Sequence, residues 1–417
     1  MKHLIVSIAG FGWEEVQKHW NGTLGDLTFQ AADSVFPAVT CTAQASFRTA
    51  SPVRDHGMVS NGVFFRKLFK PSFWEQSARL VQGPRIWEKA RAEWRKVAVL
   101  FWQQSLGENA DIIISPTPIH KHEGGMIMAN YTKPSDLAPK LEKEFGTFPL
   151  HRYWGPLASP KIGDAVTDHV EATVRYLDPD IVFCYLPTLD YDLQRYGPED
   201  ARCNRSFKIL AHELKRLVAL AEKHGAELTL FGDYAIAPVT TAPVLPNALL
   251  RKQGYFKVRD LRGMAYPDFY ESKAFAMCDH EVAHVYVQDS KDIQPLMDLF
   301  KSSGDYDDVL PRTADASWGH PNAGEILLVA KDGSWCAYPW WLDAREAPDY
   351  ATHVDIHNKP GYDPCELFFG RHFPPATSLD GTKIKGSHGR RRPIAYYSTS
   401  ASGQDLVELA ASLQLQL

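Results

Sequence analysis

The sequence predicts an α/β fold with a central, mostly parallel β-sheet between helices. Residues 3–9 form an apolar, β-branched run that ends at a glycine, which is typical of a buried parallel strand. Similar runs at 181–186 and 226–231 each follow a stretch with helical spacing, at 162–177 and 204–223. This alternation of helices and buried strands is the pattern of a parallel sheet covered on both faces.

Length and composition fit one large catalytic unit. The chain has 417 residues, of which 44% are hydrophobic and 23% charged, as in ordinary folded proteins. A net charge of −5 argues against a nucleic-acid scaffold role and against binding to anionic membranes. No apolar stretch is long enough to span a bilayer. We expect a single domain over residues 1–417, with inserted cap segments at about 63–155 and 240–330.

The cysteine pattern indicates a reducing compartment. The six cysteines are scattered and form no CxxC pair, which favours buried free thiols over a disulfide framework. The apolar run at the N-terminus is too short for the core of a signal peptide. These observations predict a cytoplasmic protein.

The segment 34–62 carries the most informative pattern. A short apolar strand is expected to end at Pro37, and residues 40–49 are expected to form a helix. Thr40 and Thr42 then lie in the turn before that helix, where free N–H groups and the helix dipole favour an anion. A hydroxyl there can act as a nucleophile if its pKa is lowered. The alternative is that Thr40 is only a helix cap.

Two carboxylates follow predicted strands. Asp190 comes after 181–186, and Asp233 comes after 226–231. Carboxylates at the carboxyl ends of parallel strands lie where α/β folds place their chemistry. For Asp190 the alternative is capping of the next helix.

Two aromatic stretches and a histidine pair complete the expectations for local structure. Within the aromatic and basic stretch 63–96, helices are expected around the turn Gln82-Gly83-Pro84, and the run 335–342 predicts an aromatic core strand. His280 and His284 are four residues apart, which on a helix makes a metal pair. The alternation after Val282 indicates a strand, so a structural role is expected for both histidines.

The segment 34–62 resembles the nucleophile segment of the nucleotide pyrophosphatase/phosphodiesterase branch of the alkaline phosphatase superfamily. The matching residues are Phe36-Pro37, Thr40, Thr49 to Pro52, His56-Gly57 and Asn61. The resemblance implies that Thr40 is the nucleophile, that Thr42 is its nearest rival, and that Asn61 donates its amide N–H to a phosphoryl oxygen. The family has a glycine where this chain has Ala50.

The resemblance extends to about residue 398 and implies an alkaline phosphatase-like sheet. It also implies a divalent cofactor, zinc or manganese, held by the metal ligands Asp190, Asp233 and His388. The family's remaining ligands are lost, because the chain has Ala9, Gln194 and Tyr234 at those positions. The loop 353–364 offers the second-rank metal candidates Asp355, His357 and Asp363, unless it is only a solvated turn.

The resemblance therefore implies a metal-dependent phosphoryl ester hydrolase that forms a threonyl-phosphate intermediate. Its expected partner is a phosphorylated small molecule or a nucleotide. The lost ligands motivate a different class of protein, a pseudoenzyme that binds a phosphorylated ligand without turnover. A phosphomutase or sulfatase-like relative is disfavoured by the spacing after Thr40.

Overall fold

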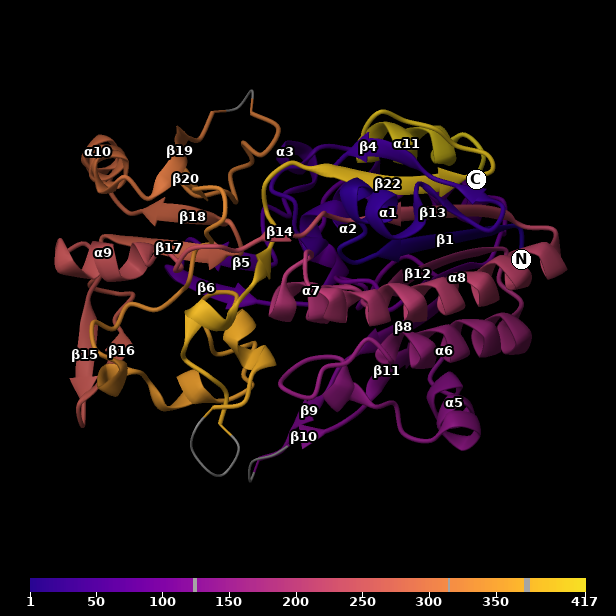
Figure 1. Ribbon diagram of the computed structural model, residues 1–417, viewed down its shortest axis with the longest axis horizontal. Coiled ribbons are helices and arrows are strands. Elements are labelled where there is room, and N and C mark those ends of the chain that lie inside the picture. The colour runs from indigo at the N-terminus through magenta and orange to yellow at the C-terminus, as the bar shows by residue number, and fades with distance from the viewer. Residues whose placement is uncertain (123–125, 314–315, 371–375) are drawn as a thin grey trace.

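The larger half of the molecule is built on an eight-stranded sheet (Figure 1). In this computed structural model, residues 1–122, 126–313, 316–370 and 376–417 are described. The order of the strands is β11 (Asn130–Lys133), β8 (Ile112–Pro116), β7 (Val97–Leu100), β12 (Ile181–Leu186), β1 (His3–Ile8), β13 (Glu227–Gly232), β22 (Pro393–Ser398) and β4 (Gln30–Asp33). The strands from β8 to β13 are parallel. At the edges, β11 and β22 pair antiparallel with β8 and β13, and β4 pairs antiparallel with β22. The expected fold class is confirmed.

The central strands end together at one edge of this sheet. All residues of β1 and β12 are buried, as their continuous apolar sequences require. Ile8 at the end of β1 is in register with Leu186 of β12 and with Gly232 of β13. The segments that follow these three strands therefore begin side by side, and they carry the predicted carboxylates.

Helices flank the sheet. Helices α6 (Ile162–Leu177) and α8 (Asn204–His224) pack against each other and against β12 and β13, respectively. Helix α2 (Thr40–Thr49) packs on α11 (Leu406–Gln414) and stacks Phe47 on Phe231 of β13, with ring centroids 4.0 Å apart. The other helices of this half are α1 (Trp13–Trp20), α3 (Val53–His56), α4 (Glu88–Ala92), α5 (Leu137–Phe145) and α7 (Asp190–Tyr196).

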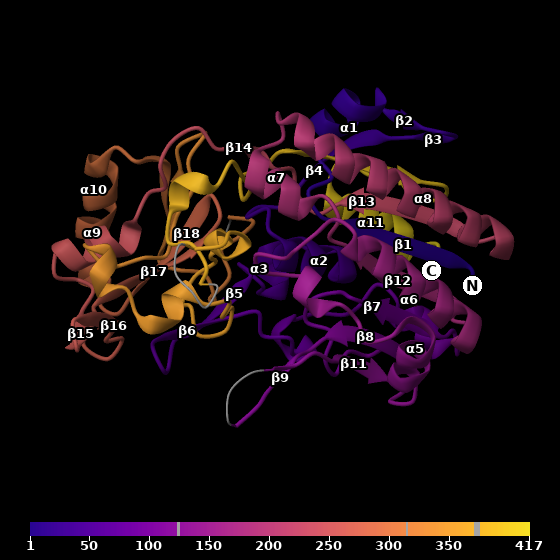
Figure 2. The same cartoon turned by 60° about the horizontal axis from the view of Figure 1, so that its bottom comes forward.

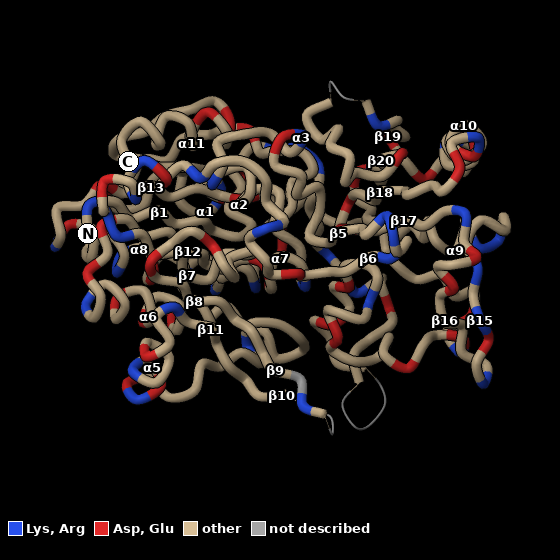
Figure 3. The backbone as a smooth tube through the Cα atoms, turned by 180° about the vertical axis from the view of Figure 1, so that it is seen from behind, with Lys and Arg blue, Asp and Glu red and all other residues tan. Residues whose placement is uncertain are grey.

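A second, antiparallel sheet lies beside the first (Figures 1 and 2). Its order is β17 (Ala274–Asp279), β18 (Val282–Val287), β20 (Ile326–Ala330) and β19 (Tyr306–Pro311), with helices α9 (Pro246–Lys252) and α10 (Ile293–Ser303). The short strand pairs are β2–β3 (Thr23–Leu24, Leu27–Thr28), β5–β6 (Gly62–Phe65, Lys70–Phe73), β9–β10 (Ile119–His120, Met126–Ile127), β14–β21 (Ala237–Pro238, Gly386–Ser387) and β15–β16 (Val258–Leu261, Met264–Pro267). Lysines and arginines are interspersed with acidic residues over both halves (Figure 3).

The segments expected as caps contribute to both halves. Residues 63–155 supply β7, β8 and β11 to the large sheet and nearly all of the hairpin β5–β6, whereas 240–330 supply all four strands of the second sheet. Within the described ranges, no helix has the length and apolar character needed to cross a bilayer.

The helices expected around the turn at residues 82–84 are present but short, a 3₁₀-helix at Ala78–Leu80 and α4. Residues 62–73 before them form the hairpin β5–β6, in which Phe64 and Phe73 alternate with outward residues and pack on the second sheet. Two local expectations are wrong. Residues 335–342 are buried in large part but form only an isolated bridge at Cys336, since Pro339 interrupts any ladder. The strand before Pro37 ends earlier, at Asp33.

Candidate active site

Helix α2 presents Thr40 to a deep cavity. Thr40 is the first residue of the helix, is 5% exposed, and lines a pocket of about 520 Å³. Thr42 points away, because its hydroxyl donates to the carbonyl oxygens of Pro37 and Val39 at 2.5 and 2.8 Å. Thr42 Oγ1 also accepts from the backbone N–H of Val39, the N-cap residue, at 3.3 Å, so Thr42 stabilises the start of α2 while the Thr40 hydroxyl faces the pocket.

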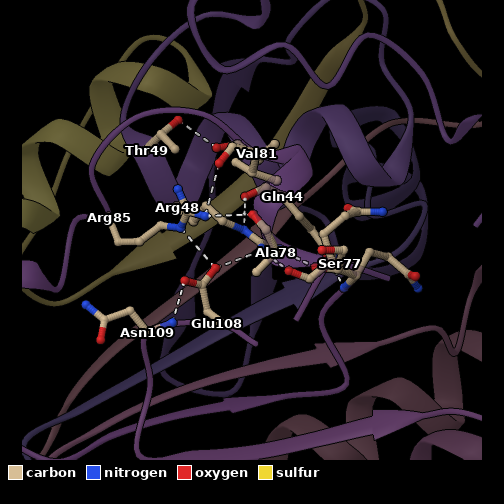
Figure 4. A network of polar contacts seen from close by, with 12 residues as sticks. Gln44, Arg48, Thr49, Ser77, Ala78, Val81, Arg85, Glu108 and Asn109 are labelled. Carbon is tan, nitrogen blue, oxygen red and sulfur yellow. Dashed lines mark hydrogen bonds and ion pairs between the residues drawn. The ribbon is translucent and has the colours of Figure 1, made fainter. Parts of the chain in front are cut away.

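The other end of α2 is fixed by a buried ionic network (Figure 4). The Arg48 guanidinium is fully buried and lies 3.4 Å from Glu108, which also accepts from Arg85 Nε at 2.9 Å. Arg48 further donates to the backbone carbonyls of Gln103 and Gln104. Burial lowers the pKa of Arg48 to about 10, so the group stays charged at neutral pH. The network holds the helix that carries Thr40.

Asn61 braces the start of α2 from the side. Its Oδ1 accepts from the backbone N–H of Cys41 at 3.0 Å, and its Nδ2 donates to Asp279 Oδ1 at 3.1 Å. The expectation that this amide N–H faces a phosphoryl oxygen is thus corrected, since Asn61 is 1% exposed and does not line the pocket. Burial raises the pKa of the Cys41 thiol to about 12, which leaves it a weak nucleophile.

Asp190 lies at the first turn of α7 and is held by two side chains. Tyr234 Oη donates to Asp190 Oδ1 at 2.8 Å, and Gln194 Nε2 donates to Oδ2 at 2.8 Å. Gln194 in turn accepts from Tyr362 Oη at 2.9 Å. Burial raises the pKa of Asp190 to about 6, although both hydrogen bonds oppose that shift.

Asp233 follows β13 and faces the backbone of the neighbouring strand end. Its Oδ1 accepts from the N–H groups of Gly10 and Tyr234 at 3.3 and 2.9 Å. Its Oδ2 is buried and has no hydrogen-bond partner. Burial raises the pKa of Asp233 well above its usual range, and the charge of Asp190 adds to this effect.

Four aromatic rings form a continuous stack along one wall of the pocket. The ring centroids of Tyr234 and His388 are 3.5 Å apart, those of His388 and His280 are 3.6 Å apart, and those of His280 and Tyr362 are 3.8 Å apart. His388 Nδ1 donates to the Ala38 carbonyl at 2.7 Å, which leaves Nε2 as an acceptor. Burial lowers the pKa of His388 to about 3 and that of His280 well below its usual range, so both rings are neutral.

The pocket itself is aromatic and carries no cationic side chain among its described lining residues. Its aromatic walls include Trp74, Trp102 and Trp154 in addition to the four-ring stack. Its carboxylates are Asp190, Glu75 and Asp355. Such a lining suits an apolar or aromatic organic group better than a highly charged polyanion.

The donors present do not fit the two-metal centre that the resemblance implies. Ala9 carries no donor, and Gln194 and Tyr234 are weaker ligands than the imidazoles they replace. Both oxygens of Asp190 already accept hydrogen bonds, so of the two strand-end carboxylates it is Asp233 that has a buried oxygen, Oδ2, without a hydrogen-bond partner. Over the described part of the chain, no group of three His, Cys, Asp or Glu residues is arranged to hold a metal ion.

The second-rank metal candidates divide between the pocket and the protein interior. Asp355 and His357 both line the pocket, and His357 Nδ1 is 3.2 Å from the carbonyl oxygen of Phe73. Asp363 is not among the lining residues; it forms a buried ion pair with Lys359 at 2.8 Å and caps the N–H of Cys365. The loop 353–364 therefore contributes Asp355 and His357, but not Asp363, to the wall of the pocket.

Several residues of the site were not expected from the sequence. His280 lies at the turn between β17 and β18 with a φ of 60°, and it lines the pocket instead of the core. His284, the other histidine of the pair, has the structural role expected of it, because its Nε2 lies 3.0 Å from the carbonyl oxygen of Val59. Nothing in the sequence indicated that Tyr362 would line the pocket, except that it lies in a loop rich in His and Asp.

The fold and this arrangement of a threonine and two strand-end carboxylates define an alkaline phosphatase-like α/β protein. Residues 3–363 match the type I phosphodiesterase / nucleotide pyrophosphatase family, and the chain belongs to that family. The predicted family is thereby confirmed, and with it the general class of phosphoryl hydrolases. No curated protein matches the chain.

Solved structures with the same fold are distant in sequence. Murine ectonucleotide pyrophosphatase / phosphodiesterase 5 superposes with a TM-score of 0.60 at 13% identity, over 100% of this chain and 95% of that one. Phosphonoacetate hydrolase from Sinorhizobium meliloti 1021, in complex with phosphonoacetate, gives a TM-score of 0.65 at 14% identity over the same shares. An inactive threonine-to-alanine variant of the murine protein, in complex with AMP, gives 0.60 at 13% over the same shares.

Proposed function

We propose that this protein hydrolyses a phosphoryl ester, of the phosphodiesterase or nucleotide pyrophosphatase type, with Thr40 as the nucleophile. The observation that carries the proposal is the position of Thr40, at the start of α2 and in the wall of the pocket. A helix N-terminus lowers the energy of the negative charge that develops on an attacked phosphoryl group. The inactive threonine-to-alanine variant of the murine relative supports the same assignment.

The reaction has two steps. Thr40 Oγ1 attacks phosphorus in line, and the ester oxygen leaves with its electron pair to give a threonyl-phosphate. Water then attacks the same phosphorus and releases Thr40. Asn61 is a positioning residue in this scheme, because it fixes the backbone beside Thr40 through Cys41.

The substrate is a phosphorylated small molecule whose organic part fills the aromatic pocket. AMP and phosphonoacetate, bound by the relatives, are first probes of this class. Among the described lining residues no Lys or Arg neutralises charge, which favours a singly charged diester over a polyphosphate.

Zinc or manganese is the cofactor that the family suggests. Asp190, Asp233 and His388 would be its donors, but they do not fit two ions, so no step here depends on a metal. The assay therefore includes both metals and a chelator.

The test is hydrolysis of bis(4-nitrophenyl) phosphate by the full-length protein. Turnover by the wild type that is lost in Thr40→Ala, and kept in the matched control Thr42→Val, supports the assignment. Equal turnover by wild type and Thr40→Ala contradicts it.

A binding protein without turnover is the second candidate. It is favoured because both carboxylate oxygens of Asp190, a metal ligand in the family, already accept hydrogen bonds from side chains. Calorimetry with AMP and with phosphonoacetate separates the two candidates. Stoichiometric binding without product for any ester tested supports the binding protein, and measurable hydrolysis rejects it.

A further inference from the structure

A buried carboxylate at the end of β17 connects the second sheet to the segment that braces α2. Asp279 Oδ2 accepts from Ser60 Oγ at 2.7 Å and from the backbone N–H of Asn61 at 2.8 Å. Asp279 Oδ1 accepts from Asn61 Nδ2 at 3.1 Å. All three side chains are buried, and Asp279 is not among the lining residues of the pocket. Its effect on the site therefore passes through the residues that it holds.

The chemistry of these groups fixes the direction of the Asn61 amide. An ionised carboxylate only accepts hydrogen bonds, so the Nδ2 end of the amide must face Asp279. The Oδ1 end then faces the backbone N–H of Cys41, which donates to it at 3.0 Å. The reverse orientation would set two acceptors against each other at Asp279 and two donors against each other at Cys41. The carboxylate thus decides which end of the amide meets α2.

The amide meets α2 at the residue next to Thr40. Cys41 is the second residue of the helix, and its N–H is one of the first-turn donors that a helix leaves without a partner in its own backbone. The hydrogen bond to Asn61 Oδ1 supplies that partner from outside the helix. It therefore fixes the first turn of α2, to which the Thr40 side chain is attached.

The turn that follows Asp279 is fixed to the first half of the molecule. Glu281 accepts from the two terminal nitrogens of Arg392 at 2.5 and 2.8 Å, and from the backbone N–H of Arg390 at 3.0 Å. The backbone N–H of Glu281 donates to the carbonyl oxygen of His388 at 2.8 Å. Asp279 is consequently held at a constant position relative to the segment 388–392 on the opposite side of the site.

We propose that Asp279 is a positioning residue for the nucleophile Thr40. It directs the Asn61 amide, which fixes the N–H of Cys41 and with it the first turn of α2. The inference rests on the proposed function, since it concerns the same nucleophile. It makes the second sheet part of the catalytic unit, because a residue of β17 sets the position of a residue of α2.

The test exchanges the two side chains. In Asp279→Asn, whichever way the new amide turns, its NH2 group meets either Asn61 Nδ2 or the backbone N–H of Asn61, so two donors face each other. The double variant Asp279→Asn/Asn61→Asp restores every pairing, because the amide at 279 donates to the carboxylate at 61, whose other oxygen accepts from the N–H of Cys41. The matched control is Asp289→Asn, the same change on the exposed segment after β18, where Asp289 pairs with Lys291.

The first readout is hydrogen–deuterium exchange at the Cys41 amide of the full-length protein, resolved to single residues by mass spectrometry. Burial raises the pKa of Asp279 to about 6, so labelling at pH 8 keeps the carboxylate ionised. We expect the Cys41 amide to exchange ~10-fold faster or more in Asp279→Asn, because its hydrogen bond is lost, and at the wild-type rate in the double variant. This readout needs no substrate.

The second readout is the hydrolysis of bis(4-nitrophenyl) phosphate. Asp279→Asn should lower kcat by ~10- to 100-fold through misplacement of Thr40. Its KM should stay within ~3-fold of the wild type, because Asp279 does not line the pocket that holds the substrate. The double variant should return kcat to within ~5-fold of the wild type, and Asp289→Asn should keep wild-type values. A general loss of stability would produce neither this split of kcat from KM nor the rescue.

Three results overturn the inference: a wild-type kcat in Asp279→Asn, a wild-type exchange rate at Cys41 in that variant, or a double variant that does no better than Asp279→Asn. Circular dichroism shows whether each variant folds. If Asp279→Asn does not fold, the double variant decides, since a folded protein with near-wild-type exchange at Cys41 supports the inference and an unfolded one overturns it.

The proposed function fails separately. A wild type that hydrolyses no diester, but whose Cys41 exchange follows the expected order, supports the orienting role of Asp279 and rejects the hydrolase. Turnover that is lost in Thr40→Ala but unaffected in Asp279→Asn supports the hydrolase and rejects the inference.

Discussion

The charge of Glu108 is predicted to be essential for the helix that carries Thr40. Glu108 is the shared counter-ion of Arg48 and Arg85, and all three side chains are buried. Glu108→Gln preserves the size of the side chain and removes its charge. Two guanidinium groups are then left in the interior without an opposite charge, and breaking a buried pair in this way costs ~3–5 kcal/mol.

The structure places the expected cost near the lower end of that range. Arg48 keeps hydrogen bonds to the carbonyl oxygens of Gln103 and Gln104, so part of its charge remains solvated by the backbone. We expect Glu108→Gln to lower the free energy of unfolding by ~3 kcal/mol in urea titrations followed by tryptophan fluorescence.

The matched control is Asp343→Asn, which breaks the exposed pair with Arg345. Exposed pairs contribute little, so this variant should unfold at the wild-type urea concentration. A loss below ~1 kcal/mol for Glu108→Gln, or equal losses for both variants, refutes the reasoning.

Three further predictions concern stability. Burial raises the pKa of Glu213 to about 8 from the ordinary 4.5, so the stability contributed by its protonated form is complete below pH 4.5 and is lost as the pH rises through 8. Glu213→Gln should remove a decline of up to ~5 kcal/mol in the free energy of unfolding over that pH range. Urea unfolding at several pH values measures this decline, and a variant with the same pH profile as the wild type contradicts the prediction. Thr42→Val loses its hydrogen bonds to Pro37 and Val39 and should lower the free energy of unfolding by ~1–3 kcal/mol without abolishing turnover; loss of turnover in the folded variant would make Thr42 the nucleophile. Ala50 ends α2 with a φ of 46°, so Ala50→Gly should raise that free energy by ~1 kcal/mol, and a lower melting temperature would count against this reading.

The sheet and its long helices were predictable because their patterns are periodic and local. The strand expected at 181–186 and the helices expected at 162–177 and 204–223 match the structure within one residue. Local propensity and periodicity were therefore enough to predict these elements. At the end of the nucleophile helix, Ala50 replaces the glycine of the family, and its backbone is nevertheless left-handed, as a glycine would allow.

The composition of the site depends on contacts between distant segments, which no local pattern contains. Tyr234 and His388 stack across more than a hundred residues of sequence, and Tyr362 reaches Gln194 from a loop. The sequence marked Gln194 and Tyr234 as lost ligands but gave no sign that both would bind Asp190. A structural role was expected for His280 because the residues after Val282 alternate, but the turn after β17 places its side chain in the wall of the pocket.

The most direct test of the central claim is to trap the covalent intermediate on Thr40. The full-length protein is mixed with bis(4-nitrophenyl) phosphate, quenched in acid during turnover, and digested for mass spectrometry. The account predicts a 4-nitrophenyl phosphoryl adduct on Thr40 in the wild type and in Thr42→Val, and no adduct or turnover in Thr40→Val. Turnover that persists in Thr40→Val, or an adduct on any other residue, contradicts the account.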